Sequence, residues 1–194
     1  MTGLDRVLAA AKSLFAAHPD MQAFVDWPDD TPSTGKMMRH IPATDIVAAF
    51  DRAGTDSTQP LIDAIRAAAR DGYWIRTYTE EEVGAHFREN YGYFELVGPT
   101  GHFQSDSLRA YVAYWGPGLN YDWHRHEAEE LYVCLAGSAT FYAEGREPVD
   151  LSAGETLFHA TNQPHAMVTT DQPILTLVLW RGAGLAGLPT MDAA

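Results

Sequence analysis

The chain has 194 residues, with 13 lysines and arginines against 26 aspartates and glutamates, so its formal net charge is −13 at pH 7. No lysine- or arginine-rich run occurs, which excludes the electrostatic footprint of a protein that binds nucleic acid or an anionic membrane surface. A hydrophobic fraction of 46% excludes general disorder, and the single cysteine, Cys134, excludes an intrachain disulfide or a CxxC site. We expect a cytoplasmic protein, because the sequence has neither a basic and apolar leader nor a long apolar stretch.

The first ninety residues predict helices joined by loops. Apolar residues recur at helical spacing in the first segment, and Pro19 ends it. Thr79 followed by Glu82 predicts a capping box for a later helix. The expected segments are a helix over 3–17, a proline-rich loop over 26–42 that either covers a site or crosses the surface, a helix from Thr44 or Asp45, a helix with Pro60 in its first turn, and a short helix to about residue 89.

Beyond residue 90 the sequence changes to short β-prone runs separated by Gly and Pro turns at roughly 8–12-residue intervals. This pattern is typical of an antiparallel sandwich or barrel. We therefore expect a mainly β protein with a helical N-terminal extension, residues 1–90, packed on a β-barrel, residues 91–194. The expected strands span 91–97, 109–115, 121–126, 130–136, 138–144, 147–151, 155–159, 164–169 and 173–180.

Polar side chains gather on one face of a predicted hairpin between Gly118 and Gly137. Strand alternation places His124 and His126 on one face, and Glu130 and Tyr132 on one face of the next strand, where Cys134 also lies as a small buried side chain. Burying an unpaired carboxylate costs several kcal/mol, and the usual compensation is a charged partner or a metal ion. No lysine is near, and Arg125 alternates to the other face, so we expect a metal.

A further histidine, His165, lies in a later strand-like run and supplies a distant ligand. Two or three imidazoles with one carboxylate suit a single divalent transition metal, with Fe(II), Zn, Mn, Ni and Co left open. His159 lies outside this ligand set and is interpreted as a core or rim histidine whose hydrogen bonds are satisfied.

The fixed positions of this region resemble the cupin superfamily. The first cupin motif, G-x5-H-x-H-x3-E-x6-G, is matched by Gly118, His124, His126, Glu130 and Gly137. The second motif keeps its spacing from Gly154 to His165, with Ala160, Asn162 and Thr169 as departures. The resemblance covers about residues 109–181 and implies a double-stranded β-helix, or jelly roll, with its metal inside.

The residues around these motifs narrow the resemblance. Tyr121, Tyr132 and Trp180, together with the helical extension, look like those of the single-domain cupin dimethylsulfoniopropionate (DMSP) lyases of marine bacteria. This implies a carbon–sulfur lyase that cleaves DMSP to dimethyl sulfide and acrylate by β-elimination, with a tyrosine at the metal as base. The residues that the interpretation places at the metal are His124, His126, Glu130, Tyr132 and His165, with Tyr132 as the base.

The substrate's chemistry can be compared with the residues. A phenol near a divalent metal has its pKa lowered from about 10, which favours Tyr132 as a base. A sulfonium is best received by aromatic rings, for which Tyr121, Trp123 and Trp180 are the candidates, with Tyr114 and Trp115 behind them. Because alternation places Tyr121 and His124 on opposite faces, a bulge near residue 122 is required.

Two other functions are compatible with the same ligands. An Fe(II) cupin dioxygenase would use an open coordination position to bind dioxygen. A non-catalytic cupin would bind a small molecule beside a purely structural metal. We expect a small zwitterionic molecule as the partner, and the sequence leaves the metal's identity and the oligomeric state open.

Overall fold

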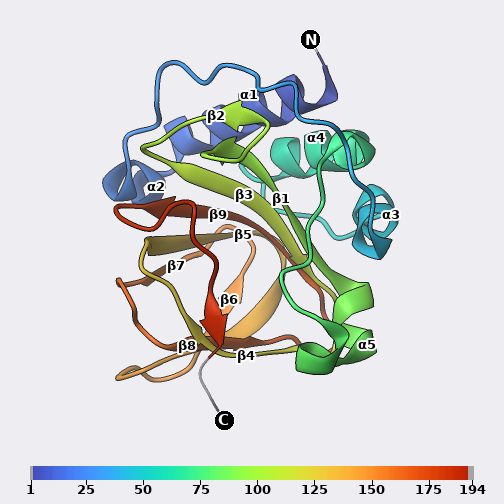
Figure 1. Ribbon diagram of the computed structural model, residues 1–194, viewed down its shortest axis with the longest axis vertical. Coiled ribbons are helices and arrows are strands. Elements are labelled where there is room, and N and C mark those ends of the chain that lie inside the picture. Colours follow the sequence, from blue (N-terminus) through green and yellow to red (C-terminus); the bar gives the residue numbers. More distant parts are fainter. Residues whose placement is uncertain (1, 192–194) are drawn as a thin grey trace.

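The computed structural model describes residues 2–191 and consists of a curled β-sheet whose outer face is covered by helices (Figure 1). The helices are α1 (Gly3–Ala17), α2 (Pro19–Phe24), α3 (Pro42–Ala48), α4 (Gln59–Ala68) and α5 (Glu80–Asn90), with a 3₁₀ turn over Ala69–Asp71. The strands are β1 (Tyr91–Gly98), β2 (Phe103–Gln104), β3 (Arg109–Trp115), β4 (Asn120–Arg125), β5 (Glu129–Ala143), β6 (Val149–Ser152), β7 (Thr156–His159), β8 (His165–Val168), β9 (Ile174–Arg181) and β10 (Thr190–Met191).

The helices follow the sequence signals closely, with two differences at prolines. Thr2 and Asp5 form a capping box at the start of α1, which has the predicted bounds. Pro19 ends α1 but also begins α2, a helix that the sequence reasoning missed, because proline fits the first turn of a helix. α3 likewise starts at Pro42, earlier than expected, and Thr44 Oγ1 accepts a hydrogen bond from the Ile41 N–H at 3.0 Å.

Two further helices connect the extension to the strands. α4 carries Pro60 in its first turn as predicted, and just before it Thr58 Oγ1 donates to the buried Leu135 carbonyl of β5 at 2.8 Å. α5 begins with the predicted Thr79–Glu82 capping box and is broken at Gly84, whose φ is 79°.

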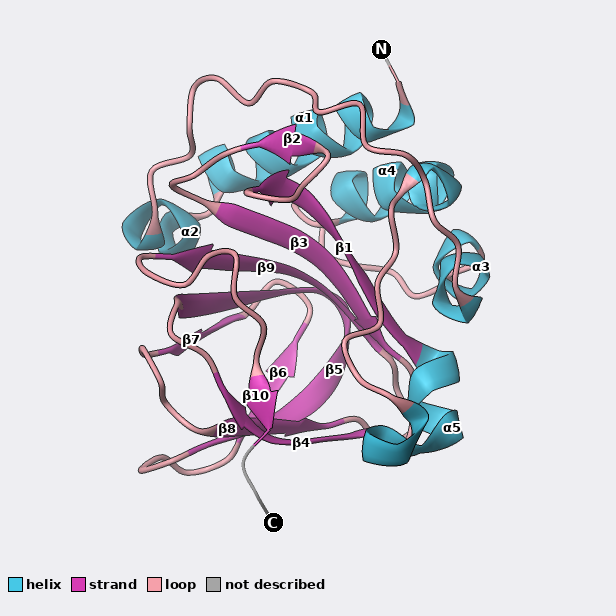
Figure 2. Ribbon diagram, in the orientation of Figure 1, coloured by secondary structure: helices cyan, strands magenta, loops and turns pink. Residues whose placement is uncertain are grey.

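The strands form one continuous hydrogen-bonded sheet in the order β10-β4-β8-β5-β9-β3-β1-β2, with β6 and β7 also paired to β5 (Figure 2). β5 belongs to both halves of this sheet, although the sequence predicted two strands separated at Gly137. The chain bends there instead, because Gly137 has a φ of 78° and an added Cβ would overlap the Pro173 carbonyl oxygen. The predicted mainly β cupin fold with N-terminal helices is confirmed.

The two faces of the curled sheet have different cores. On the outer face Leu131, Val133 and Leu135 of β5 pack with the apolar sides of α1 and α4. On the inner face lies an aromatic cluster that includes Tyr132 and Trp180. The alternation predicted for β5 therefore separates a helix-packed side from the interior. Within residues 2–191 no helix is long and apolar enough to cross a membrane.

Candidate active site

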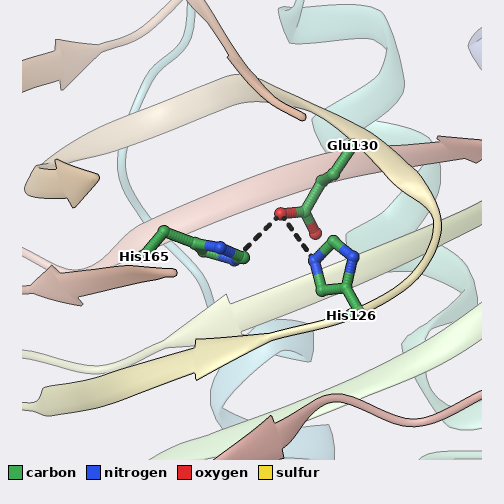
Figure 3. A group of neighbouring side chains, drawn as sticks. All are labelled: His126, Glu130 and His165. Carbon is green, nitrogen blue, oxygen red and sulfur yellow. Dashed lines mark hydrogen bonds and ion pairs between the residues drawn. The ribbon is translucent and has the colours of Figure 1, made fainter. Parts of the chain in front are cut away.

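Three predicted ligands converge inside the curled sheet (Figure 3). One ligand atom from each of His126, Glu130 and His165 lies within 4.8 Å of the others, and all three side chains are buried. A fourth, His124, is paired with His165 across β4 and β8, and the two ring centroids are 4.1 Å apart. The structure thus brings two of the predicted imidazoles and the carboxylate together, with the third imidazole beside His165.

All three histidines are held in the same way through Nδ1. Each Nδ1 lies within hydrogen-bond distance of a backbone carbonyl two residues away in the sequence, and because a carbonyl only accepts, Nδ1 carries the proton. Nε2 of each ring is then the atom with a free lone pair, which is the arrangement found in metal-ligating histidines. The pairs are His124 with the Asp122 carbonyl at 2.8 Å, His126 with that of Ala128 at 2.9 Å, and His165 with that of Gln163 at 2.8 Å.

The donor set fits a cation. Glu130 Oε2 lies 3.2 Å from His126 Nε2 and 3.3 Å from His165 Nε2. Lone pairs on a carboxylate oxygen and on two imidazole nitrogens repel one another at these distances unless a proton or a metal ion lies between them. A mixed nitrogen and oxygen set of this kind suits a divalent transition metal.

Burial and charge shift the titration of these groups. Burial holds the pKa of His124 well below its usual value, so this ring is neutral. Burial also opposes the charged forms of His126 and Glu130, but their mutual attraction is larger: it raises the pKa of His126 and, with His165, keeps the pKa of Glu130 well below its usual range. Glu130 is therefore an ionised carboxylate in the interior.

The other oxygen of Glu130 is held by two aromatic side chains. Trp180 Nε1 donates to Oε1 at 2.8 Å, and the Tyr111 hydroxyl donates to the same atom at 3.1 Å. These bonds leave Oε2 directed at the histidines. The sequence reasoning missed Tyr111, although alternation along β3 places Arg109, Tyr111 and Trp115 on the inner face.

A small cavity opens beside this centre. Its wall is mostly aromatic, and it also contains Arg109, which forms a buried ion pair with Glu95 at 3.0 Å. Sequence reasoning missed Tyr91 and Tyr93, which alternation on β1 places on one face. The lining residues are Thr77, Tyr91, Tyr93, Arg109, Tyr111, Trp115, Tyr121, His124, His126, Glu130, Tyr132, Trp180 and Pro189.

Comparison with known proteins agrees with this site. The family model for DMSP lyases matches residues 23–176. The chain belongs to the DMSP lyase family. It is 40% identical to the DMSP lyase DddQ of Ruegeria pomeroyi over 92% of this chain and 89% of that one. It also matches a crystal structure of that protein with a TM-score of 0.93 at 36% identity, covering 98% of this chain and 96% of that one. A second solved structure, described as belonging to a study of the DMSP lyases RdDddP and RnDddQII, matches with a TM-score of 0.96 at 45% identity, covering 98% of both chains.

In this DMSP lyase family member the required bulge is present. The pairing of β4 with β8 shifts between Tyr121 and His124, so both side chains line the cavity, and their rings stack at 3.9 Å. The same bulge turns Trp123 outward: its side chain is 40% exposed and lines a surface hollow with Arg125. The prediction that Trp123 lines the substrate pocket is wrong.

Trp180 lines the lyase cavity, but both a histidine and an arginine side chain already contact its ring. It stacks on His126 at 4.2 Å, and the Arg109 guanidinium lies 4.8 Å from its centroid. A ring that faces a guanidinium is unsuited to receive a second cation, so the geometry favours the positioning of Glu130 over the expected role as sulfonium receptor. Tyr114, another expected aromatic, points to the outer face and contacts Phe50.

Two buried groups of the lyase lie outside the ligand set. His159 is fully buried on β7, stacks on His165 at 4.1 Å, and has a pKa lowered to about 3, chiefly by burial. Its burial agrees with the interpretation as a core histidine, but within the described residues neither ring nitrogen has a hydrogen-bond partner, so the ring is not satisfied as expected. Burial raises the pKa of the Cys134 thiol to about 12, which makes it a small buried side chain and not a reactive one.

Proposed function

We propose that the protein cleaves DMSP to dimethyl sulfide and acrylate by base-catalysed β-elimination, with the help of a bound divalent transition metal. The observation that carries the proposal is the buried group of His126, Glu130 and His165, with His124 against His165, beside an aromatic cavity. Its similarity to the DMSP lyase DddQ over most of both chains supports the choice of substrate.

His124, His126, Glu130 and His165 would hold the metal, with Tyr132 next to them. When bound, such a metal supplies positive charge that stabilises the negative charge developing beside the substrate carboxylate and lowers the pKa of a neighbouring phenol. Its identity among Fe(II), Zn, Mn, Ni and Co is left to experiment.

Tyr132 is the proposed base. Its ring is buried among Trp115, Phe141 and His159, and within residues 2–191 its hydroxyl has no hydrogen-bond partner, so the oxygen is free to face a substrate. In the protein alone burial and then the Glu130 carboxylate raise the pKa of Tyr132 well above its usual value. A working phenolate therefore requires positive charge nearby, which is why base and metal belong to one proposal.

The reaction balances with these groups alone. The Tyr132 oxygen takes the proton from the carbon next to the carboxylate, and the electrons of that C–H bond become the double bond of acrylate. The carbon–sulfur bond breaks with its electron pair remaining on sulfur, which leaves as neutral dimethyl sulfide. Before that step the sulfonium needs a receptor without a competing cation, and the rings of Tyr91 and Tyr121 on the cavity wall provide one, with cation–π contacts of roughly 0.5–2 kcal/mol each.

The test is release of dimethyl sulfide, measured by headspace gas chromatography, with equimolar acrylate in solution. Metal-loaded protein should release both products from DMSP, and chelator-treated protein should release neither. Tyr132→Phe should abolish turnover and keep its metal content, whereas Tyr114→Phe, a matched change on the outer face, should retain activity. Near-normal turnover by Tyr132→Phe would exclude the tyrosine as base.

The rival functions give different results in the same samples. An Fe(II) dioxygenase would consume oxygen during turnover, and a binding protein would retain the ligand and release no product. A cytoplasmic location and a division of the chain at residue 90 also belong to the proposal. Their support is the single buried cysteine and the change from helix α5 to strand β1 at Asn90–Tyr91.

A further inference from the structure

The cavity wall contains a buried hydrogen-bond donor without an acceptor. The indole of Trp115, on β3, is 2% exposed and lines the cavity, and its Nε1 makes no hydrogen bond. An indole N–H can only donate, and a buried donor without an acceptor destabilises the fold. The ring lies 5.5 Å from that of Tyr91 and 5.8 Å from that of Tyr121, in tilted contacts that fix its position.

The neighbouring polar groups do not satisfy this N–H. Tyr111 and Trp180 both donate to Glu130, Tyr121 shares a hydrogen bond with Tyr78 at 2.8 Å, and Arg109 donates to Glu95 and to the Gly187 carbonyl. The Tyr132 hydroxyl and the Nε2 atoms of His124 and His126 also line the cavity, but within the described residues none of them accepts a hydrogen bond from Trp115 Nε1. A ligand that complements this wall brings an acceptor with it.

We propose that Trp115 Nε1 donates a hydrogen bond to the carboxylate of the bound ligand and so fixes which way the ligand lies in the cavity. The identification of that ligand as DMSP rests on the proposed function, but the inference needs only a small monocarboxylate. A trialkylsulfonium group offers no useful acceptor, whereas a carboxylate has two oxygens that accept. The indole N–H thus binds the carboxylate end of the ligand, and the faces of the neighbouring aromatic rings remain for the sulfonium end.

The inference explains why an unsatisfied donor is kept in a tightly packed wall. Phenylalanine at position 115 would fill most of the same volume and remove the unpaired N–H, so Trp115→Phe should fold with a melting temperature equal to or above that of the parent. A residue whose polar atom does nothing for the free protein but serves the bound state fits a substrate-binding role.

The experiment uses the full-length, metal-loaded protein with propionate as the probe, titrated calorimetrically. Trp115→Phe should weaken propionate binding about 10- to 100-fold, the loss expected for one hydrogen bond to a charged group. The control is Trp27→Phe, because the Trp27 N–H is also buried without a partner but lies outside the cavity, against Phe15. This control should bind propionate as the parent does.

A second readout does not depend on any loss of affinity. The chain has five tryptophans, and the indole N–H signal missing from the NMR spectrum of Trp115→Phe identifies that of Trp115 in the parent. Saturating propionate should move this signal downfield. Unchanged propionate affinity in Trp115→Phe, equal losses in both variants, no binding by the parent, or an unmoved signal would each overturn the inference. Absence of dimethyl sulfide production by the parent would refute the proposed function and leave the propionate result standing.

Discussion

Replacing Trp180 by phenylalanine tests how the Glu130 carboxylate is held toward the histidines. Phenylalanine keeps an aromatic ring against His126 but removes the 2.8 Å hydrogen bond from Nε1 to Glu130 Oε1. Among the residues that the structure describes, Tyr111 is then the one side chain that still holds this oxygen, at 3.1 Å. The carboxylate gains freedom to rotate, so Oε2 is no longer fixed toward His126 and His165.

The size of the effect follows from the charge on Glu130. A hydrogen bond to an ionised, buried carboxylate contributes about 1.5–3 kcal/mol. At about 1.4 kcal/mol per tenfold change, metal affinity should fall about 10- to 100-fold, the range measured when the outer partners of metal ligands are removed. If Tyr111 is also replaced by phenylalanine, the loss should increase, because Oε1 then loses both donors.

The assay is a competition between the protein and a chelator of known affinity, with bound metal measured by mass spectrometry. Trp74→Phe is the matched control. The Trp74 N–H donates a hydrogen bond of similar length, 2.7 Å against 2.8 Å for Trp180, but its acceptor is the Ala69 carbonyl under the helices. Trp74→Phe should lose stability and keep the parent's metal affinity. Equal metal affinity in Trp180→Phe and Trp74→Phe would refute the role given to the Trp180 hydrogen bond.

Three further outcomes are expected. Gly137→Ala should lower the free energy of unfolding by about 3 kcal/mol in urea denaturation, since it combines an unfavourable φ with overlap at Pro173, whereas Gly145→Ala, with a φ of 78° and open space around it, should lose only about 1 kcal/mol. Trp123→Ala should leave KM for DMSP within about twofold, because this residue lies outside the cavity; a large increase in KM would place it in the site. The His102 ring accepts a hydrogen bond from the Tyr73 N–H, and burial, with Lys36, lowers the pKa of His102 from 6.5 to about 4. As pH falls, this histidine is therefore protonated in the unfolded chain before it is protonated in the folded one. The free energy of unfolding should therefore fall as pH is lowered from about 6.5 toward 4, and His102→Gln should reduce that dependence; an unchanged slope would contradict it.

The cluster of histidines around Glu130 could be predicted because its spacing follows from strand geometry. Alternation alone places His124 with His126 and Glu130 with Tyr132, and the match to the cupin motif adds His165 from a distant strand. The positions of the strands followed from the β-prone runs between turn residues. The bulge between Tyr121 and His124 could also be inferred, because two side chains of opposite parity were required in one pocket.

The partners of these residues could not be predicted, since they depend on how strands distant in the sequence align. Tyr111 and Trp180 meet at Glu130 only because β3, β9 and β5 are neighbours, and no local pattern reports that order. Trp123 was misplaced because the bulge that brings Tyr121 inward sends the next side chains outward. α2 was missed because Pro19 was interpreted as a stop, although the same residue can begin a helix.

The alternation of β5 means that the cavity-lining face and the helix-packed face are two sides of one backbone. A chain shortened to begin at Tyr91 would leave Leu131, Val133 and Leu135 open to water on the strand that carries Glu130 and Tyr132. Such a fragment should aggregate, and it should do so before its ligands could be titrated. In random mutagenesis, substitutions in α1 and α4 should therefore be recovered among inactive clones although neither helix lines the cavity. In a screen for higher activity, stabilising α1 and α4 first should allow more substitutions in the cavity to be tolerated without loss of folding.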